Sequence, residues 1–319
     1  MIWLTWRQHR NEAFVIAGAL ALLALIIFIT GHAMMTDYQQ LGVADCIAHP
    51  SHPNCDSIVS TFEGQYEPLV GTIGWLNFLP GLLGMLIGAP LVARELEHGT
   101  HRLAWTQSVT RWRWLAVKLA LLIAGTLVAE GIITALLTWW FGPWENLLGR
   151  MTPTLYDFEG IVPFAYALFA LALGIAAGAL LRRTIPAMVV ALLGFLAVRL
   201  PIEFNVRPYF QQPLVAKFLP NGQGTKPGPL DWEIYKGFAD SAGHVVQDTT
   251  VFDTCRPTLN VGGKDQLAQC MQAHGWYFYS TYQPLSRFWT FQTIEASIFF
   301  VLIIALLALT IWWVRRRLS

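Results

Sequence analysis

Charged residues are scarce in this sequence. Asp, Glu, Lys and Arg make up 13% of its 319 residues, while 55% are hydrophobic; a soluble domain carries about 25% charged residues. Apolar runs reach roughly 20 residues, which is the length that crosses a bilayer as a helix. The net charge is only +1, so the chain has no strong basic field to attract nucleic acid. We therefore predict an all-α polytopic membrane protein with no nucleic-acid partner.

Two motifs of catalytic proteins are also absent. The chain has no G-x-x-x-x-G-K-[ST] string, which holds nucleotide phosphates. Its nearest segment, NGQGTKPG at 221–228, lacks the spacing and has a proline after the lysine, and we interpret it as a turn-rich loop. The zinc-protease strings H-E-x-x-H and H-x-x-E-H are missing as well. The sequence thus predicts that the chain is not an enzyme, binds no cofactor and holds no metal.

Six apolar segments predict six spans, with boundaries near 13–35, 69–92, 114–140, 161–181, 185–200 and 291–314. Lys and Arg gather in the N-terminal segment, the loop after span two, the turn between spans four and five, and the C-terminal tail. The connection 36–68 contains neither residue. Because basic residues concentrate in cytoplasmic connections, we predict that both termini and the basic segments lie in the cytoplasm.

This topology divides the chain into four parts. They are an interfacial segment at 1–12, spans one to five in 13–200 with an outer loop at 36–68 and a cytoplasmic loop at 93–113, an extracytoplasmic domain at 201–290, and span six with a basic tail at 291–319. Because structureless loops beyond about 12–15 residues are uncommon, we expect the extracytoplasmic domain to be a small ordered cap. Gating of release, substrate binding and shielding of a dimer are all open roles for it.

All four cysteines lie in connections predicted to be outside, where disulfides persist. The local pairs Cys46–Cys55 and Cys255–Cys270 are the simplest solution, although four cysteines allow three connectivities. The first pair encloses CIAHPSHPNC, whose histidines and cysteines also offer the ligand types of a zinc site. Two prolines forbid a regular helix through that segment, and we favour the disulfide.

The first ten residues, MIWLTWRQHR, combine aromatic and basic side chains. On a helix, Trp3 and Trp6 share one face, while Arg7 and Arg10 turn toward water. We predict a helix that lies in the cytoplasmic interface and is anchored there by its tryptophans. A basic segment that only sets the topology is the alternative.

The most unusual stretch is residues 93–118, ARELEHGTHRLAWTQSVTRWRWLAVK. It places five basic residues, two glutamates, two histidines and three tryptophans between two spans. One interpretation is a metal site, because Glu97, His98 and His101 are near neighbours at helical spacing. The missing protease motifs and the helix-weakening Gly99 argue against it. The other interpretation is a docking surface for a soluble partner, which could pass force to both flanking spans.

This stretch resembles the loop after the second span in ATP-binding-cassette (ABC) exporter permeases of the second type. Those permeases show a second span rich in small residues, an E-x-E-x-G-T-like string, a Ser/Thr–Arg pair and a Lys that opens span three. The matching residues here are Glu95, Glu97, Gly99, Thr100, Ser108, Arg111 and Lys118. The N-terminal interfacial helix, the six spans and the large connection before span six are also similar to the family's plan.

The resemblance implies a permease subunit of an ATP-driven exporter in a bacterial plasma membrane. Its loop would hold a coupling helix that docks on a separate ATPase, and that partner would bind ATP and Mg²⁺. The expected assembly has two ATPases and a second permease copy, as a homodimer or a pseudo-symmetric heterodimer in membrane lipid. An amphipathic drug, lipid, peptide or glycan would move outward. The residues expected to take part in coupling are Arg94, Glu95, Glu97, Gly99, Thr100, Arg102, Trp105 and Arg111.

Glu130 is the one acid deep inside a predicted span. Because an ionisable group is costly at such depth and indicates function, Glu130 is our candidate for the substrate path. A protonated Glu that bonds a neighbouring helix is the alternative. His32, Arg199, Glu203 and Glu295 lie near the outer ends of spans, and we interpret them as interfacial groups. We find no paired intramembrane charges of the kind that would indicate an ion exporter.

Span two carries glycines at 81, 84 and 88, which place small residues on a common stripe and let helices approach closely. The stripe could belong to a dimer seam, to the substrate path or to packing within the chain. The main rival to a transporter is a membrane sensor or accessory protein. Its cap would bind a ligand and its loop would signal inward without moving solute.

Overall fold

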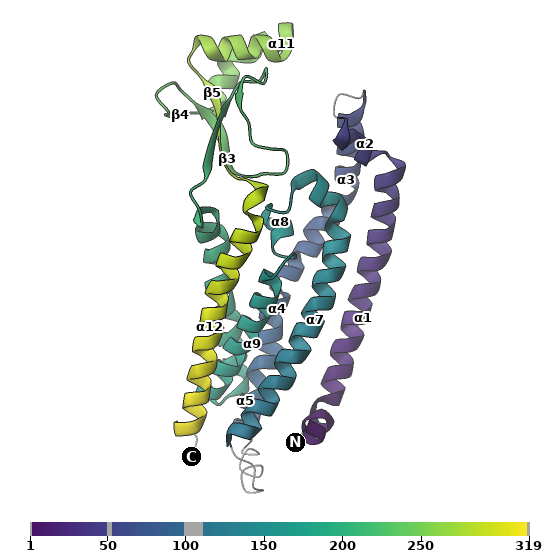
Figure 1. The fold of residues 1–319 in the computed structure, drawn as a ribbon, viewed down its shortest axis with the longest axis vertical. Coiled ribbons are helices and arrows are strands. Elements are labelled where there is room, and N and C mark those ends of the chain that lie inside the picture. Colours follow the sequence, from purple (N-terminus) through teal and green to yellow (C-terminus); the bar gives the residue numbers. More distant parts are fainter. Residues whose placement is uncertain (1, 50–52, 99–110, 318–319) are drawn as a thin grey trace. The chain divides into compact units, whose positions relative to one another are not determined.

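The structure, a computed structural model, describes residues 2–49, 53–98 and 111–317, without the side chains of 2–13, 16, 111–115, 256–263 and 317 (Figure 1). The chain forms two compact units. The first, which we call the membrane unit, comprises Met1–Pro143, Tyr156–Ile202 and Gln292–Ser319. The second, which we call the cap unit, comprises Trp144–Leu155 and Glu203–Phe291.

Among the described residues, six helical segments are long and apolar enough to cross a membrane. They are built from α1 (Ile2–Gln40); α3 (Cys55–Gly74), η1 (Trp75–Phe78), α4 (Leu79–Leu83), η2 (Gly84–Gly88) and α5 (Ala89–Glu97) in succession; α7 (Arg111–Leu148); α9 (Val162–Leu181); α10 (Thr184–Pro201) with η3 (Ile202–Val206) and η4 (Arg207–Tyr209); and η5 (Leu285–Arg287) with α12 (Phe288–Arg317). The short helices α2 (Val43–Ala48) and α8 (Pro153–Tyr156) lie in connections. The structure is mostly helical, and the predicted helical fold with six candidate spans is confirmed; the prediction of an all-α chain did not include the sheet described below.

The helices around the first connection extend further than predicted. The sequence indicated a loop at 36–68, whereas α1 ends and α3 begins well inside that range. The carboxylate of Asp37 accepts hydrogen bonds from the Gln65 amide (2.9 Å) and from the Tyr66 hydroxyl (2.6 Å). These bonds hold two polar helix ends together beyond their apolar segments. Hydropathy does not detect such a pairing, so the sequence did not indicate that this connection is largely helical.

α9 is the central helix of the membrane unit and is buried along nearly its whole length (Figure 1). A Cβ atom on Gly84 of η2 would lie 2.7 Å from the carbonyl carbon of Ala170 in α9. A Cβ atom on Gly174 of α9 would lie 2.8 Å from the nitrogen of Ala89 in α5. Only glycine allows backbones to meet this closely. The glycine stripe of span two is therefore used for packing within the chain.

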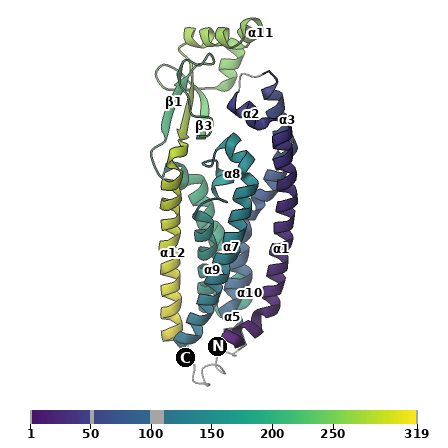
Figure 2. The same cartoon turned by 45° about the vertical axis from the view of Figure 1, so that its right-hand side comes forward.

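The N-terminal end of α1 and the C-terminal end of α12 lie at the same end of the membrane unit, which we call the termini end (Figure 2). This is the arrangement that an even number of spans requires. α1 is one continuous helix from Ile2, so no helix break sets off the predicted interfacial segment 1–12. The placement of Trp3, Trp6, Arg7 and Arg10 at a membrane surface stays a prediction.

The cap unit contains a five-stranded antiparallel sheet with the strand order β2-β1-β5-β3-β4. Its strands are β1 (Leu214–Phe218), β2 (Gly224–Thr225), β3 (Trp232–Ala239), β4 (Val245–Val246) and β5 (Tyr277–Gln283). α11 (Asp248–Ala273) contributes Val251, Cys255 and Met271 to a buried core that includes Phe238 of β3. This unit is ordered and contains a sheet that was not predicted from the sequence, while its role as an extracytoplasmic cap stays a prediction.

Both predicted disulfides are present. Cys46–Cys55 joins α2 to the first residue of α3, and Cys255–Cys270 lies within α11. The two Cα atoms of the second pair are 5.8 Å apart although 15 residues separate them in sequence. A straight helix of that length would span about 22 Å, so α11 folds back on itself between the cysteines.

Loss of the Cys255–Cys270 disulfide is expected to destabilise the cap unit by about 3 kcal/mol, because the bond closes a loop of 15 residues. Without it, the folded-back form of α11 would open, and trypsin should cut faster after the exposed Lys264. The measurement is limited proteolysis of the Cys255→Ser, Cys270→Ser double variant, followed by mass spectrometry. Trypsin should cut the matched Cys46→Ser, Cys55→Ser variant after Lys264 at the same rate as the parent protein. Equal rates in both double variants would contradict this account.

Candidate functional site

The predicted coupling residues flank the loop after the second span. α5 ends at Glu97 and α7 begins at Arg111, both at the termini end of the membrane unit (Figure 2). The structure describes the side chains of Arg94, Glu95 and Glu97 and the backbone of Arg111. Gly99, Thr100, Arg102 and Trp105 lie outside the described residues. The described part of this site is the base of the loop.

Glu95 joins α5 to α7. Its carboxylate forms a hydrogen-bonded ion pair with the ammonium group of Lys118, whose side chain is 4% exposed. Removing one partner of a buried pair leaves the other charge desolvated and uncompensated. The pair therefore holds the end of span two against the start of span three. Glu95, predicted to contact an ATPase, is engaged within the chain.

Glu97 joins α5 to α10. Its Oε2 atom accepts hydrogen bonds from the backbone N–H (2.9 Å) and from the hydroxyl (2.7 Å) of Thr184. Thr184 is the first residue of α10, and the first N–H groups of a helix have no partner inside it. A carboxylate here satisfies one such donor and interacts favourably with the helix dipole. Glu97 of span two thus caps span five.

Below these contacts, α5 packs into a core shared by several spans. One cluster unites α5 with α7, α9 and α12 through Leu91, Val92, Leu119, Leu171, Ile175, Ala179 and Val314. A second unites α5 with α9 and α10 through Ala89, Ala93, Ala177, Ala187 and Ala191. Closely packed interiors transmit displacement instead of absorbing it. We call Glu95, Glu97, Lys118 and Thr184, together with this packing, the α5 joint.

The structure argues against a metal site in this loop, because one of its candidate ligands, Glu97, is already bonded. The carboxylate of Glu97 is bonded to Thr184, and the His98 ring Nδ1 lies 2.8 Å from the Arg94 carbonyl oxygen. His101 lies outside the described residues. In the cap unit, Cys255, Cys270 and His274 have ligand atoms within 4.8 Å of one another. Both sulfurs are in a disulfide and supply no thiolate. The predicted lack of a metal and a cofactor stays a prediction.

A group of buried polar side chains forms a second candidate site, which the sequence analysis missed. Arg199 of α10 forms an ion pair with Asp157, with 2.7 Å between Nη2 and Oδ2. The Arg199 guanidinium carbon lies 4.0 Å from the centroid of the Tyr166 ring. The Tyr166 hydroxyl donates a hydrogen bond to Glu295 at 2.5 Å and lies 3.3 Å from Asp157. We call these four residues and Gln292 the buried polar cluster.

Gln292 of α12 links the cluster to the start of α9. Its Oε1 accepts hydrogen bonds from the backbone N–H groups of Ile161 and Val162, both at 3.0 Å. Its amide group donates to the carbonyl of Tyr156 at 3.1 Å. Val162 is the first residue of α9, so span six caps span four in the way that span two caps span five.

The interpretation of Arg199 and Glu295 as interfacial groups was wrong, because the residues are 3% and 0% exposed. The Asp157–Arg199 ion pair is a buried charge pair that the sequence alone did not reveal, although Asp157 lies between two candidate spans and not within one. Position near a span end was equated with exposure, whereas Asp157 and Tyr166 contact Arg199, and Tyr166 also contacts Glu295, inside the membrane unit. A usable signal was present: two acids in DFEG, at 157–160, directly precede span four.

A family model described as "ABC-2 membrane transporter related" matches residues 17–207, more than half of the chain. The chain belongs to this ABC-2 family. No curated protein and no solved structure matches it. The matched range contains Glu95, Glu97, Lys118 and Thr184 of the α5 joint and three members of the buried polar cluster, and it ends before the sheet of the cap unit. With its six candidate spans, this ABC-2 protein is a multi-pass membrane permease.

In this ABC-2 protein, the predicted path residue Glu130 lies on α7 and is 6% exposed. Thr134, one helical turn further on, is 9% exposed, so both face the interior of the membrane unit. Within the described part of the chain, Glu130 makes no hydrogen bond and no ion pair. A buried acid of this kind in a span indicates function by default. Glu130 stays a candidate for the substrate path.

Proposed function

We propose that this ABC-2 protein is the membrane-spanning permease subunit of an ATP-driven exporter. It couples to two separate ATPase subunits through the loop at 93–113 and works beside a second permease copy. The complex moves an amphipathic drug, lipid, peptide or glycan outward across a bacterial plasma membrane, with both chain termini in the cytoplasm. The family assignment supports the proposal, because ABC-2 permeases normally work with ABC ATPases.

The α5 joint is the observation that carries the coupling part of this proposal. The loop leaves α5 and enters α7, and Glu95 and Lys118 bind these two helices together at its base. Glu97 extends the connection to Thr184 at the first turn of α10. Because backbone contacts also lock α5 against α9, a push on the loop displaces spans two, three, four and five together. From the sequence, force was expected to reach the two spans that flank the loop.

We expect docking and transmission to fall on different residues. In the sequence, Arg102 belongs to the loop between α5 and α7, whereas Glu97 is bonded inside the chain. We therefore expect Arg102→Glu to reduce ATPase binding by about tenfold or more, because a reversed interface charge costs several kcal/mol. Thr184→Val keeps the loop intact and removes one hydrogen bond of the cap, worth about 1 kcal/mol. That variant should retain the ATPase but transport less substrate per ATP hydrolysed.

The test is affinity purification of the tagged full-length chain from its native membrane in mild detergent, with mass spectrometry of what stays bound. A Walker-motif ATPase should be recovered with the parent and with Thr184→Val, and lost with Arg102→Glu. Glu67→Gln, which changes an exposed acid of α3, is the matched control and should behave like the parent. Recovery without any ATPase, or with a kinase or regulator instead, would overturn the exporter proposal and favour the sensor.

A further inference from the structure

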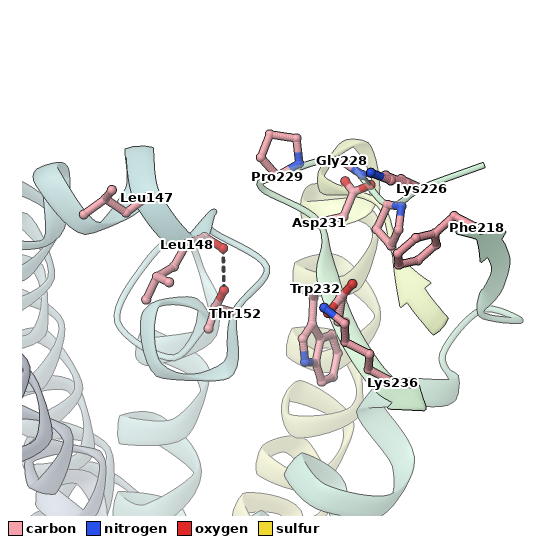
Figure 3. Close-up of a pocket in the computed structure, with 12 residues that line it drawn as sticks. Leu147, Leu148, Thr152, Phe218, Lys226, Gly228, Pro229, Asp231, Trp232 and Lys236 are labelled. Atoms are coloured by element: carbon pink, nitrogen blue, oxygen red, sulfur yellow. Dashed lines mark hydrogen bonds and ion pairs between the residues drawn. The ribbon is translucent and has the colours of Figure 1, made fainter. Parts of the chain in front are cut away.

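The cap unit holds a pocket of about 480 Å³ (Figure 3). One wall comes from the end of α7 and the turn after it, with Leu147, Leu148 and Thr152. The opposite wall comes from β3, from the segment leading into it and from the end of β1. Its residues are Phe218, Lys226, Pro227, Gly228, Pro229, Asp231, Trp232, Glu233 and Lys236. The string NGQGTKPG, which looked like a failed nucleotide-binding loop, thus supplies part of this rim.

Close contacts hold the two walls in place. Gly149 has a φ of +78°, and a Cβ atom there would lie 2.9 Å from the Cα of Leu230, so the turn after α7 lies directly against the opposite wall. The carboxylate of Asp231 accepts hydrogen bonds from the backbone N–H groups of Gly228 (2.8 Å) and Leu285 (2.9 Å). Each carboxylate oxygen serves a different segment. The pocket is therefore preformed, which lowers the entropy lost on binding.

The charged side chains around the pocket differ in whether they already have hydrogen-bond or ion-pair partners. Asp231 uses both oxygens on main-chain donors. Glu233 is shared between the Ser280 hydroxyl (3.4 Å) and Lys236 (3.7 Å). Lys226 has no acceptor among the described residues, and its ammonium nitrogen lies 5.5 Å from the centroid of the Phe218 ring. Both carboxylates are therefore engaged by partners within the protein, while the ammonium group of Lys226 is available to bind an anion.

Lys236 adds a second available ammonium group. Its pairing with Glu233 is long, and both side chains are partly exposed, at 56% and 35%. Exposed pairs of this kind contribute little free energy, so an anion that binds both lysines competes with them easily. Next to these charges lie the apolar surfaces of Leu147, Leu148, Phe218, Pro229 and Trp232.

We propose that this pocket binds an amphipathic organic anion, with its phosphate-, sulfate- or carboxylate-type head group on Lys226 and Lys236. The apolar body lies between the end of α7 and Trp232. An anion bound by two ammonium groups gains charge-assisted hydrogen bonds, which are stronger than neutral ones. This inference deepens the proposed function by naming a substrate class, and it rests on that function only for the transport of the bound molecule.

The test is equilibrium dialysis of radiolabelled hexyl phosphate against the full chain in nanodiscs of neutral phosphatidylcholine, with empty nanodiscs as the partition blank. Hexyl phosphate should bind more tightly than inorganic phosphate, which lacks the apolar body, and more tightly than hexyltrimethylammonium, which has the opposite charge. The Lys226→Ala, Lys236→Ala variant should bind hexyl phosphate about a hundredfold more weakly, since each of the two charge-assisted bonds contributes roughly the 1.4 kcal/mol that equals a tenfold change.

The matched control is Lys217→Ala. Lys217 belongs to the same sheet, lies 4.8 Å from the Tyr277 ring centroid and does not line the pocket, so its replacement should leave the affinity unchanged. Circular dichroism checks that each variant is folded. Unchanged affinity in the double variant, an equal loss in Lys217→Ala, or preference for the ammonium compound would overturn the proposal.

A further arm separates the two sources of such an anion. Phosphatidylglycerol is added to the nanodiscs: competition with hexyl phosphate identifies a membrane lipid as the occupant, and its absence identifies a soluble anion. Either result is consistent with an anion-binding site in this pocket. Because dialysis needs neither an ATPase nor transport, the binding test stays valid if the exporter proposal fails. Likewise, failure to bind hexyl phosphate would leave the exporter proposal standing.

Discussion

Arg199→Met is expected to destabilise the membrane unit by about 3–5 kcal/mol, the largest effect of any single substitution considered for this protein. The change removes the cation that pairs with Asp157 at 2.7 Å and lies over the Tyr166 ring. Asp157 and Glu295 would then stay buried without the positive charge of Arg199 nearby. The measurement is the temperature at which half of the purified protein leaves the monodisperse peak in size-exclusion chromatography.

The matched control is the partly exposed ion pair between Glu145 and Arg150, whose side chains are 33% and 29% exposed. Glu145→Gln breaks this pair and should cost at most about 1 kcal/mol. The double variant Asp157→Asn, Arg199→Met should recover part of the loss, because neither charge of the pair is left uncompensated. A transition temperature for Arg199→Met that equals that of Glu145→Gln would falsify the role of this pair.

Gly174→Ala is expected to separate α9 from the second span and to lower stability by about 1–3 kcal/mol, although alanine favours helix by about 1 kcal/mol over glycine. The new methyl group would lie 2.8 Å from the Ala89 nitrogen. That neighbour is backbone and cannot rotate away. Because α5 then loses its support at the α5 joint, ATP-driven transport should fall even where the protein is still folded.

Gly125→Ala is the matched control for this substitution. Gly125 lies in α7, and a Cβ atom there would have no heavy atom within 4 Å. The same chemical change should therefore stabilise the protein by up to about 1 kcal/mol through helix propensity alone. Opposite signs of the two shifts in transition temperature are the expected result. If Gly174→Ala also raises the temperature, the close approach of α9 to α5 is not tight in solution.

Several features follow from the sequence by itself. The six spans were predicted because hydrophobic length is a local property, and twenty apolar residues in a row cross a bilayer whatever they pack against. The cysteine pairs were predicted because their partners are 9 and 15 residues away. The resemblance of residues 93–118 to an exporter loop agreed with the family found for the chain, since that motif is also contiguous.

Only the tertiary structure decided which polar residues are partners. Glu97 and Thr184 are 87 residues apart, and Gln292 caps a helix that begins 130 residues earlier. The sheet likewise places β5 between β1 and β3, strands that lie far upstream of it. Such contacts depend on how helices and strands pack, and no periodicity or charge count along the chain encodes them. For the same reason Arg199 and Glu295 look interfacial in sequence, yet they are buried once α9, α10 and α12 come together.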